Sequence, residues 1–411
     1  MRAVVIGPGR IGCGFAGHLL AESGYEVTFV GRGAIVDDLE RAGEYRVRLV
    51  NGPRATETVI RGVHGKKLDD PCVAQLIAEA DVVAVSVGTA GLTGVAKLLA
   101  DGLARRATPG NVLAFENAPE AGVFLQRAVE AHLPAAEHGR HGFSGALVSR
   151  IVTRREGGAG APLVFVGDPP AGFVVHGPSL RGPLPVIAGM QVVEDYRAWV
   201  QKKLFTFSAG HATTAYLGAL KGYRYVHAAI RDLEIRARVL AAMEEGRRGL
   251  EAQYGPELAG TPQDLVAIVQ RFENAALNDP IERVGRDPKR KLGCDDRIVG
   301  AALLAERAGV RPLRLALAAA AALCFECPGD ASACALQRDV AEQGAGEVLG
   351  TVAGLDPAMG LGRMVTQEWK RLSAGRAPDA KMLSLDRRMW SWRADAEAPA
   401  LATLPPLRNE A

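Results

Sequence analysis

The stretch AVVIGPGRIGCGF, residues 3–15, decides the fold of the first half of the chain. Its four leading apolar residues predict a buried strand, and a glycine pattern of the GxGxxG type comes directly after them. In such a turn the glycines permit a tight bend, close approach of backbone to a pyrophosphate, and packing of the next helix, whose N-terminus faces the anion. A tight turn without a ligand is the alternative. We therefore predict a dinucleotide-binding turn formed by Gly7, Gly9, Arg10, Ile11 and Gly12.

The segments after this turn alternate between short apolar strands and amphipathic helices. Strands are predicted at 26–30, 81–87 and 111–115, which is the βαβ pattern of a doubly wound sheet of the Rossmann type. Apolar and polar side chains alternate within residues 45–63, so we expect an antiparallel excursion there. Residues 134–186 are rich in glycine and proline and contain another pair of predicted strands.

From about residue 190 the pattern becomes long and helical, which predicts an all-α second domain. The last residues are aperiodic and rich in proline, as is typical of an extended surface tail. The predicted fold class is an α/β Rossmann-type sheet followed by an all-α C-terminal domain. The predicted divisions are 1–190 for the dinucleotide-binding domain, 191–385 for the helical substrate domain and 386–411 for the tail.

The composition is that of an ordinary globular protein, with 411 residues, 48% of them hydrophobic, and a net charge of only +3. This small charge argues against a nucleic-acid partner. No leader and no apolar run of about 18 residues is visible, so we expect a cytoplasmic monomer or homodimer without a membrane partner. Six irregularly spaced cysteines predict reduced thiols, and the three in CFECPGDASAC (324–334) are not a full zinc set, so we expect no metal site.

The residues after the second strand bear on the choice of cofactor. A site for NAD usually places Asp or Glu about 20 residues after the glycines, where the carboxylate bonds the ribose hydroxyls. In this sequence Gly31 and Arg32 stand at that place. Without a carboxylate nothing repels a 2′-phosphate, and Arg32 can pair with it. We therefore favour NADP over NAD, with a solvated loop arginine as the alternative.

The stretch KKLFTFSAGHATTAYLGALKG, residues 202–222, places a lysine, a hydroxyl and an imidazole in apolar surroundings. Lys203 suits a proton carrier if burial and nearby cations lower its pKa from about 10.4 to roughly 7–8. Ser208 and His211 lie on one helix face, and both can donate to an oxygen. On a straight helix Lys203 lies about 80° from His211 and about 140° from Ser208, so convergence requires an irregular turn or a long reach. A structural helix is the alternative.

Residues 202–218 resemble a family signature, the motif RKLFxxNxGHAxxAYLG of the long-chain polyol (mannitol) dehydrogenase family, in its branch that acts on phosphorylated mannitol. Further similar segments run in order over residues 1–385: GPGRIGCGF, FEN, RIV, LPVIAGM and RFENAALNDPIERVGRDPKRKLG. The resemblance implies a Rossmann domain, a helical domain and no metal. It also implies Lys203 as general acid and base, with His211 orienting or binding the substrate oxygen. The activity implied is that of an NAD(P)-dependent oxidoreductase that interconverts a secondary alcohol and a ketone.

The sequence departs from the family pattern where substrate and cofactor are expected. The motif asparagine, an oxyanion donor, is Ser208, and two polar positions of the segment DSxVDRIVP are Gly145 and Ser149. The family's FENP ends in Ala275, and its ADxN after the second strand is VGRG. Losing one oxyanion donor costs on the order of 10²–10³ in turnover, of which a serine hydroxyl can restore part. The departures imply retained redox chemistry on another phosphorylated polyol, sugar or cyclitol.

The segment ERVGRDPKRKL, residues 282–292, carries a cluster of basic side chains. A phosphate monoester bears about −1.5 to −2 charges at pH 7 and accepts bidentate guanidinium contacts. The resembling enzymes that act on unphosphorylated polyols tend to lack two of these arginines, at 286 and 290. A solvated surface run of charge is the alternative. The predicted substrate contacts are Arg283, Arg286, Arg290 and, near the reacting end, Lys291.

The ends of two other strands supply the last candidates. Gly88 comes after the strand 81–87 and is predicted to line the cofactor. Glu116 and Asn117 end the strand 111–115, at the carboxyl edge where α/β proteins bind ligands. We assign Asn117 to the cofactor or substrate and Glu116 to the substrate or a proton route, with a structural strand end as the alternative. Two rival functions stay open: a hydroxy-acid dehydrogenase whose arginines bind a carboxylate, and a dinucleotide-binding sensor that has lost catalysis.

Overall fold

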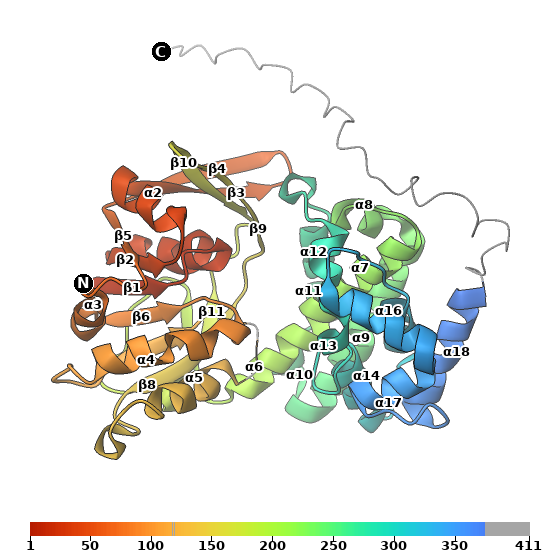
Figure 1. Ribbon diagram of the computed structural model, residues 1–411. Coiled ribbons are helices and arrows are strands. Elements are labelled where there is room, and N and C mark those ends of the chain that lie inside the picture. The colour runs from red at the N-terminus through yellow and green to blue at the C-terminus, as the bar shows by residue number, and fades with distance from the viewer. Residues whose placement is uncertain (117, 119, 375–411) are drawn as a thin grey trace, which may run out of the picture.

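The computed structural model describes residues 1–116, 118 and 120–374, and its N-terminal half is a doubly wound α/β domain (Figure 1). The strands of its large sheet are β1 (Arg2–Ile6), β2 (Glu26–Gly31), β5 (Val63–Lys67), β6 (Val82–Val85), β7 (Asn111–Ala114), β8 (Gly142–Val148), β11 (Phe173–His176) and β12 (Met190–Val193). Their order is β12-β11-β8-β7-β6-β1-β2-β5, and the strands from β8 to β5 run parallel. The strand β11 runs antiparallel to β8. The predicted Rossmann-type sheet is confirmed.

Helices cover both faces of this sheet because its strands are apolar on both sides. Along β1, Ala3 and Val5 face a core that includes Phe15, while Val4 and Ile6 face a second core formed with α3, α4 and α5. This alternation results from the two-residue repeat of a strand. The helices of this half are α1 (His18–Glu22), α2 (Ala34–Ala42), α3 (Val73–Glu79), α4 (Leu92–Leu103) and α5 (Ala121–Glu130), and a π-helical turn spans Gly12–Gly17.

A second, four-stranded sheet packs beside the glycine turn. Its strands are β3 (Glu44–Asn51), β4 (Arg54–Arg61), β9 (Val152–Gly158) and β10 (Ala161–Gly167), in the order β4-β3-β10-β9. The hairpin of β3 and β4 is the antiparallel excursion expected from the sequence. The parallel pairing of β10 with β3 joins two insertions that lie far apart in the chain. The rings of Tyr45 and Phe165 pack edge to face between these two strands, with centroids 5.7 Å apart.

The C-terminal half consists of packed helices, as predicted (Figure 1). The helices are α6 (Tyr196–Lys203), α7 (Ala209–Leu220), α8 (Val226–Arg231), α9 (Leu233–Tyr254), α10 (Pro256–Ala259), α11 (Pro262–Phe272), α12 (Ile281–Gly285), α13 (Pro288–Lys291), α14 (Val299–Arg307), α15 (Leu313–Leu323), α16 (Ala331–Gln343), α17 (Ala345–Ala353) and α18 (Gly360–Ala374). The alanine-rich α15 is buried from Leu315 to Leu323 and contacts α7, α9 and α18. Small side chains let these helices pack around it closely.

Local signals fix where several of these helices begin. Asp232 caps α9 by accepting hydrogen bonds from the backbone N–H groups of Glu234 and Ile235. Thr261 and Asp264 form a reciprocal capping box at the start of α11. The predicted tail, 386–411, lies outside the described residues. Within the described part of the chain, no helix is both long enough and apolar enough to cross a bilayer.

Candidate active site

A cavity of about 430 Å³ lies between the two halves of the molecule. One wall comes from the glycine turn, from residues after β6 and β7, and from the segment 148–152. The other wall comes from the stretch 203–212 and the segment 283–297. Most residues predicted for the site meet in this cavity: Gly9, Arg10, Ile11, Gly88, Glu116, Lys203, Ser208, His211, Arg283, Arg286, Arg290 and Lys291.

The glycine turn fits a dinucleotide on the evidence of its own packing. Gly7 has a φ of +100°, and a Cβ there would lie 2.2 Å from the carbonyl oxygen of Ser86. A Cβ on Gly12 would lie 1.9 Å from the carbonyl oxygen of Gly7. Gly9 has no atom within 4 Å of its Cβ position and lines the cavity. Gly7 and Gly12 therefore shape the turn, while Gly9 leaves the open side that a pyrophosphate requires.

A π-helical turn, Leu204–Ser208, lies between α6 and α7 and supplies the irregularity that convergence requires. The hydroxyl of Thr206 donates to the carbonyl oxygen of Lys202, which supports the widened turn. On the facing helix α9, a Cβ at Gly246 would lie 2.3 Å from the carbonyl oxygen of Phe205. A π turn inserts one residue into a helix and rotates the side chains beyond it to a new direction. Lys203, Ser208 and His211 consequently all line the same cavity.

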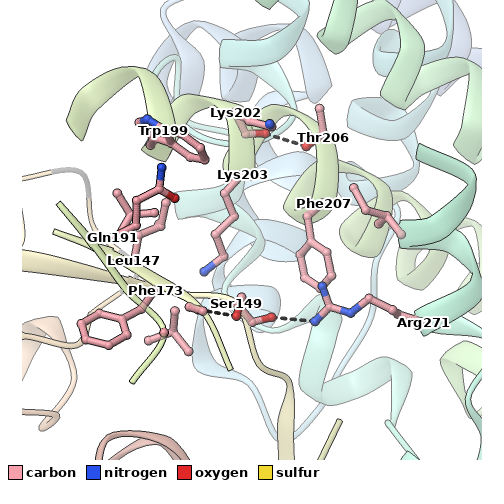
Figure 2. Close-up of a pocket in the computed structure, with 15 residues that line it drawn as sticks. Leu147, Ser149, Phe173, Gln191, Trp199, Lys202, Lys203, Thr206, Phe207 and Arg271 are labelled. Atoms are coloured by element: carbon pink, nitrogen blue, oxygen red, sulfur yellow. Dashed lines mark hydrogen bonds between the residues drawn. The ribbon is translucent and has the colours of Figure 1, made fainter. Parts of the chain in front are cut away.

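Lys203 is half-buried at the meeting point of two cavities. Its side chain extends from α6 toward Ser149, as Figure 2 shows. The second cavity has a volume of about 310 Å³, and its walls include Leu147, Phe173 and Trp199. Burial lowers the pKa of Lys203 to about 7, and the positive charges of two arginines add to that effect: Arg297 first and then Arg271. The amine can therefore change protonation near neutral pH.

His211 is oriented by a carboxylate that the sequence analysis did not identify. Its Nε2 lies 3.1 Å from Asp279 Oδ2, and its ring stacks on Phe272 with centroids 4.8 Å apart. Arg283 donates from Nε and Nη2 to the two carboxylate oxygens of Asp279. Burial lowers the pKa of His211, against the opposing effect of Asp279, so the imidazole is neutral at pH 7. The available signal was an acidic residue four positions before Arg283, the spacing of an ion pair on one helical turn.

Glu116 stands at the carboxyl end of β7 and lines the cavity. Its Oε1 accepts a hydrogen bond of 2.7 Å from the backbone N–H of Gly88. Burial raises the pKa of Glu116 to about 7, although hydrogen bonds from the backbone of Gly88 and Val87 oppose the shift. A carboxyl group and an amine that both titrate near neutrality therefore share one cavity. The neighbouring candidate Asn117 lies outside the described residues.

The basic candidates differ in what already occupies their donors. Arg290 pairs with Asp287 and Asp296 at 2.6 and 2.8 Å. Lys291 is buried and donates to the carbonyl oxygens of Val284 and Arg286, so it holds the chain that presents Arg286. Arg283 is likewise paired with Asp279. The side chain of Arg286 is exposed, so of the four basic candidates it is the one most accessible to a bound anion.

Arg10 brings a guanidinium to the same place from the opposite wall. It donates to the carbonyl oxygen of Thr153 at 2.9 Å and lines the cavity. Burial lowers the pKa of Arg10, and the charges of Arg283 and Arg286 lower it further, which places the three cations close together. Such a group of guanidiniums from both halves can hold an anion that carries two charges.

Gly31 and Arg32 lie away from the cavity, at the carboxyl end of β2. A Cβ on Gly31 would lie 2.4 Å from Cδ of Pro8 in the glycine turn. Arg32 is exposed. Lys67, on the neighbouring strand β5, pairs in register with Gly31, and its Nζ lies 3.3 Å from Asp37. The sequence gives no sign that Lys67 and Arg32 lie at the same edge, because that follows from the pairing of β2 with β5.

Two positions that depart from the family pattern, Gly145 and Ser149, make contacts within the protein. A Cβ on Gly145 would lie 2.5 Å from the hydroxyl oxygen of Tyr196, so the tyrosine fills the space where the family has a polar side chain. The hydroxyl of Ser149 donates to the carbonyl oxygen of Gly172. Among residues 1–116, 118 and 120–374, no group of three or more His, Cys, Asp or Glu side chains is placed to hold a metal ion.

Comparisons with known proteins agree over nearly the whole chain. Residues 1–205 match the family model described as the mannitol dehydrogenase Rossmann domain, and residues 195–372 match the mannitol dehydrogenase C-terminal domain. The chain is 36% identical over 382 residues to a Bacillus licheniformis protein named mannitol-1-phosphate 5-dehydrogenase, covering 90% of this chain and 100% of that protein. A Geobacillus thermodenitrificans protein of the same name is 37% identical over 389 residues, covering 90% and 99%.

Solved structures agree in fold. Pseudomonas fluorescens mannitol 2-dehydrogenase, solved with NAD and D-mannitol, superposes with a TM-score of 0.74 at 19% identity, over 91% of this chain and 92% of that one. A D-sorbitol dehydrogenase superposes with a TM-score of 0.72 at 17% identity, over 91% and 93%.

Proposed function

The chain belongs to the mannitol dehydrogenase family and is an oxidoreductase of CH–OH groups, and we propose that it interconverts a secondary alcohol and a ketone on a phosphorylated polyol, sugar or cyclitol. The observation that carries the proposal is the shared cavity, in which the glycine turn, Lys203, His211 and a group of guanidiniums meet. The relatives named mannitol-1-phosphate 5-dehydrogenase support a phosphorylated substrate. The departures at Gly145, Ser149 and Ser208 favour a carbon skeleton other than mannitol.

Lys203 is the proposed proton carrier. When bound, the nicotinamide cofactor accepts or supplies the hydride. In alcohol oxidation the neutral amine of Lys203 removes the hydroxyl proton, and in ketone reduction its ammonium form returns a proton. Because the pKa of Lys203 is about 7, oxidation should rise with pH through neutrality and reduction should fall. The Ser208 hydroxyl donates to the substrate oxygen as charge develops on it. Neutral His211, whose one N–H donates from Nε2 to Asp279, orients the substrate hydroxyl through Nδ1.

The proposed phosphate contacts are Arg10, Arg283 and Arg286. The backbone that presents Arg286 is held by Lys291, which donates to its carbonyl oxygen, and by Arg290, which pairs with the adjacent Asp287. Arginine donors come in a fixed planar fork that matches phosphate oxygens. Because Arg10 belongs to the Rossmann half and the others to the helical half, a bound phosphate would draw both walls together. This arrangement supports a phosphorylated substrate over a neutral polyol.

NADP is the favoured cofactor, and Arg32 with Lys67 is the proposed pair for its 2′-phosphate. Both side chains stand at the carboxyl edge of β2 and β5, where register places Lys67 beside Gly31. Asp37 pairs with Lys67 and lowers the net positive charge there, so the preference over NAD should be moderate. The Pseudomonas fluorescens enzyme, by contrast, was solved with NAD.

A spectrophotometric panel tests the proposal. Sugar, polyol and cyclitol phosphates are offered with NADP(H) and with NAD(H), each beside its dephosphorylated counterpart. We expect turnover of at least one phosphorylated substrate, at a kcat/KM about 10²-fold above that of its counterpart. Equal rates for the two forms, or turnover of hydroxy acids alone, would contradict it. An Arg286→Met variant should lose the preference for phosphate while keeping kcat on the dephosphorylated substrate.

A further inference from the structure

Arg271, near the end of α11, crosses from the helical half to the Rossmann half (Figure 2). Its Nε donates to Asp168 Oδ2 at 2.8 Å, and its Nη2 donates to the carbonyl oxygen of Ser149 at 2.6 Å. The guanidinium carbon lies 4.7 Å from the centroid of the Phe207 ring, within the π-helical turn that comes after Lys203. One side chain therefore joins three elements around the Lys203 amine.

Asp168 completes this contact from the Rossmann half. Its side chain is buried, and its Oδ1 accepts a hydrogen bond of 2.6 Å from the backbone N–H of Ile151. Burial raises the pKa of Asp168, and Arg271 opposes that shift. A buried carboxylate is strongly disfavoured without its cation, so the two side chains hold each other. The segment 149–151, which forms part of the cavity wall, is thereby tied to α11.

We propose that Arg271 is a positioning residue for the hydride-transfer reaction: it fixes the segment 149–151 against the helices that carry Lys203 and keeps a positive charge beside the amine. The inference rests on the proposed function of Lys203 as proton carrier. Arg271 acts through Lys203 and through the cavity wall. Arg271 lines the second cavity together with Lys203, whereas Arg283 and Arg286 line the first.

The signs of the charges around Lys203 decide what the loss of Arg271 should do. Burial lowers the pKa of Lys203 most, and the charges of Arg297 and Arg271 come next. Arg297 is paired with Asp296, and Arg271 with Asp168. Removing Arg271 deletes a cation and leaves a carboxylate nearby, so the pKa of Lys203 should rise. The other charged or titratable groups that line the two cavities, among the described residues, are Arg10, Glu116, Arg150, Lys202, His211, Arg283, Arg286, Arg290 and Lys291.

Competitive labelling measures the pKa of Lys203 without a substrate. The full-length protein reacts with trace acetic anhydride across a pH series, and mass spectrometry monitors the peptide that contains Lys203. In Arg271→Met the pKa should rise by about one unit, whereas in Arg271→Lys, which keeps the charge, it should stay near the parent value. As a matched control, Arg236→Met removes another arginine of the helical half, paired with Glu273, and should change nothing.

The variant Asp168→Asn distinguishes two effects of Arg271 on the pKa of Lys203: its positive charge and the contact that it makes with Asp168. This variant loosens the same contact but removes an anion, so the pKa of Lys203 should fall or stay unchanged. A rise of about one unit in Asp168→Asn would mean that loosened packing moves the pKa of Lys203, and that result would overturn the proposal. The Asp168→Asn result decides even if Arg271→Met does not fold.

Turnover supplies the second readout. In Arg271→Met the rise of kcat for oxidation with pH, which reports the pKa of Lys203, should move to higher pH by about one unit, as the labelling curve does. In Arg271→Lys and Asp168→Asn, kcat should fall about tenfold without that displacement, as expected when a reacting geometry is loosened. Labelling needs no turnover, so a failed substrate panel with an intact labelling result would count against the proposed function alone.

Discussion

The π-helical turn Gly12–Gly17 and the π-helical turn Leu204–Ser208 belong to the two halves that enclose the cavity, and they are accommodated in opposite ways. In the first, Gly12, Gly14 and Gly17 supply the space on the turn itself, and its one large side chain, Phe15, packs in the core. Side chains at Gly14 and Gly17 would collide with Val152 and with the ring of Phe29, so the turn fits tightly between the two sheets. In the second, the turn carries large residues, and the space is provided by Gly246 on the facing helix.

The difference shows how each turn contributes to the site. The first is buried and holds the preceding loop at the cavity, where the open side of Gly9 lets backbone approach an anion. The second exists to direct side chains, because an extra residue in the helix brings Lys203 toward the face of Ser208 and His211. The cofactor side of the cavity is therefore built from backbone, and the proton-transfer side from side chains.

The largest expected effect is on the side-chain half, in Lys203→Met. Turnover should fall by about 10³-fold or more because the proton carrier is lost, while cofactor affinity, measured by nicotinamide fluorescence, should stay unchanged. Lys202→Met, one residue earlier on the same helix, is the matched control and should keep turnover within a few-fold. Residual turnover within tenfold of the parent in Lys203→Met would refute the assignment.

The same variant makes a prediction about stability. The pKa of Lys203 is about 7 in the folded protein and about 10.4 in an unfolded chain, so the unfolded state binds the proton more tightly. The amine therefore destabilises the fold increasingly as pH falls from about 10 to 7. Lys203→Met should raise Tm at pH 7 and should lose this advantage near pH 10, which thermal unfolding at the two pH values measures.

The next effect tests the direction that the second π turn gives to Lys203. Inserting an alanine after Thr206 rotates Lys203 by about 100° relative to His211, so turnover should fall by about 10²-fold. Deleting Thr206 instead leaves the two residues seven apart, about 20° from alignment on a regular helix, so this matched control should keep turnover within about tenfold. Circular dichroism and steady-state kinetics together measure this outcome. Full turnover in the insertion variant would mean that the long lysine reaches its place whatever the direction of the helix.

Two matched glycine substitutions sharpen the comparison. Gly12→Ala places a Cβ 1.9 Å from the carbonyl oxygen of Gly7, and Gly246→Ala places one 2.3 Å from the carbonyl oxygen of Phe205. Each should cost about 1–3 kcal/mol of stability. The first should weaken cofactor binding about tenfold, and the second should lower kcat with cofactor affinity intact. Gly94→Ala, whose Cβ meets nothing within 4 Å, is the control; the same kinetic defect in both variants would erase the distinction.

The smallest expected effect lies at the far end of the cofactor half. Arg32→Asp should reduce the ratio of kcat/KM for NADP over NAD about fivefold to tenfold, because it exchanges a phosphate partner for a carboxylate that repels phosphate and suits ribose hydroxyls. The exposed position and the neighbouring pair of Lys67 with Asp37 keep the effect modest. An unchanged ratio would exclude Arg32 from cofactor choice.

Much of this arrangement could be predicted from the sequence because its signals are local. The GxGxxG spacing after an apolar strand predicts the glycine turn, and the switch to long amphipathic stretches predicts the helical half, and both are present. The predicted meeting of Lys203, Ser208 and His211 required an irregular turn, and the π turn is present. Asp279, Asp168 and Arg271 escaped prediction, because a carboxylate or guanidinium resembles a solvated surface charge until its partner is known.

The sequence by itself determined the βα alternation, the glycines of the dinucleotide-binding turn, and the set of side chains able to carry a proton or hold a phosphate. Only the tertiary structure decided which of these work together. It buried Lys203 beside two arginines, set Asp279 against His211, and brought Arg10 across the cavity to Arg283 and Arg286. The physical reason is that strand and helix patterns depend on neighbours along the chain, whereas a pKa or an ion pair depends on burial and on charges that folding brings from distant segments.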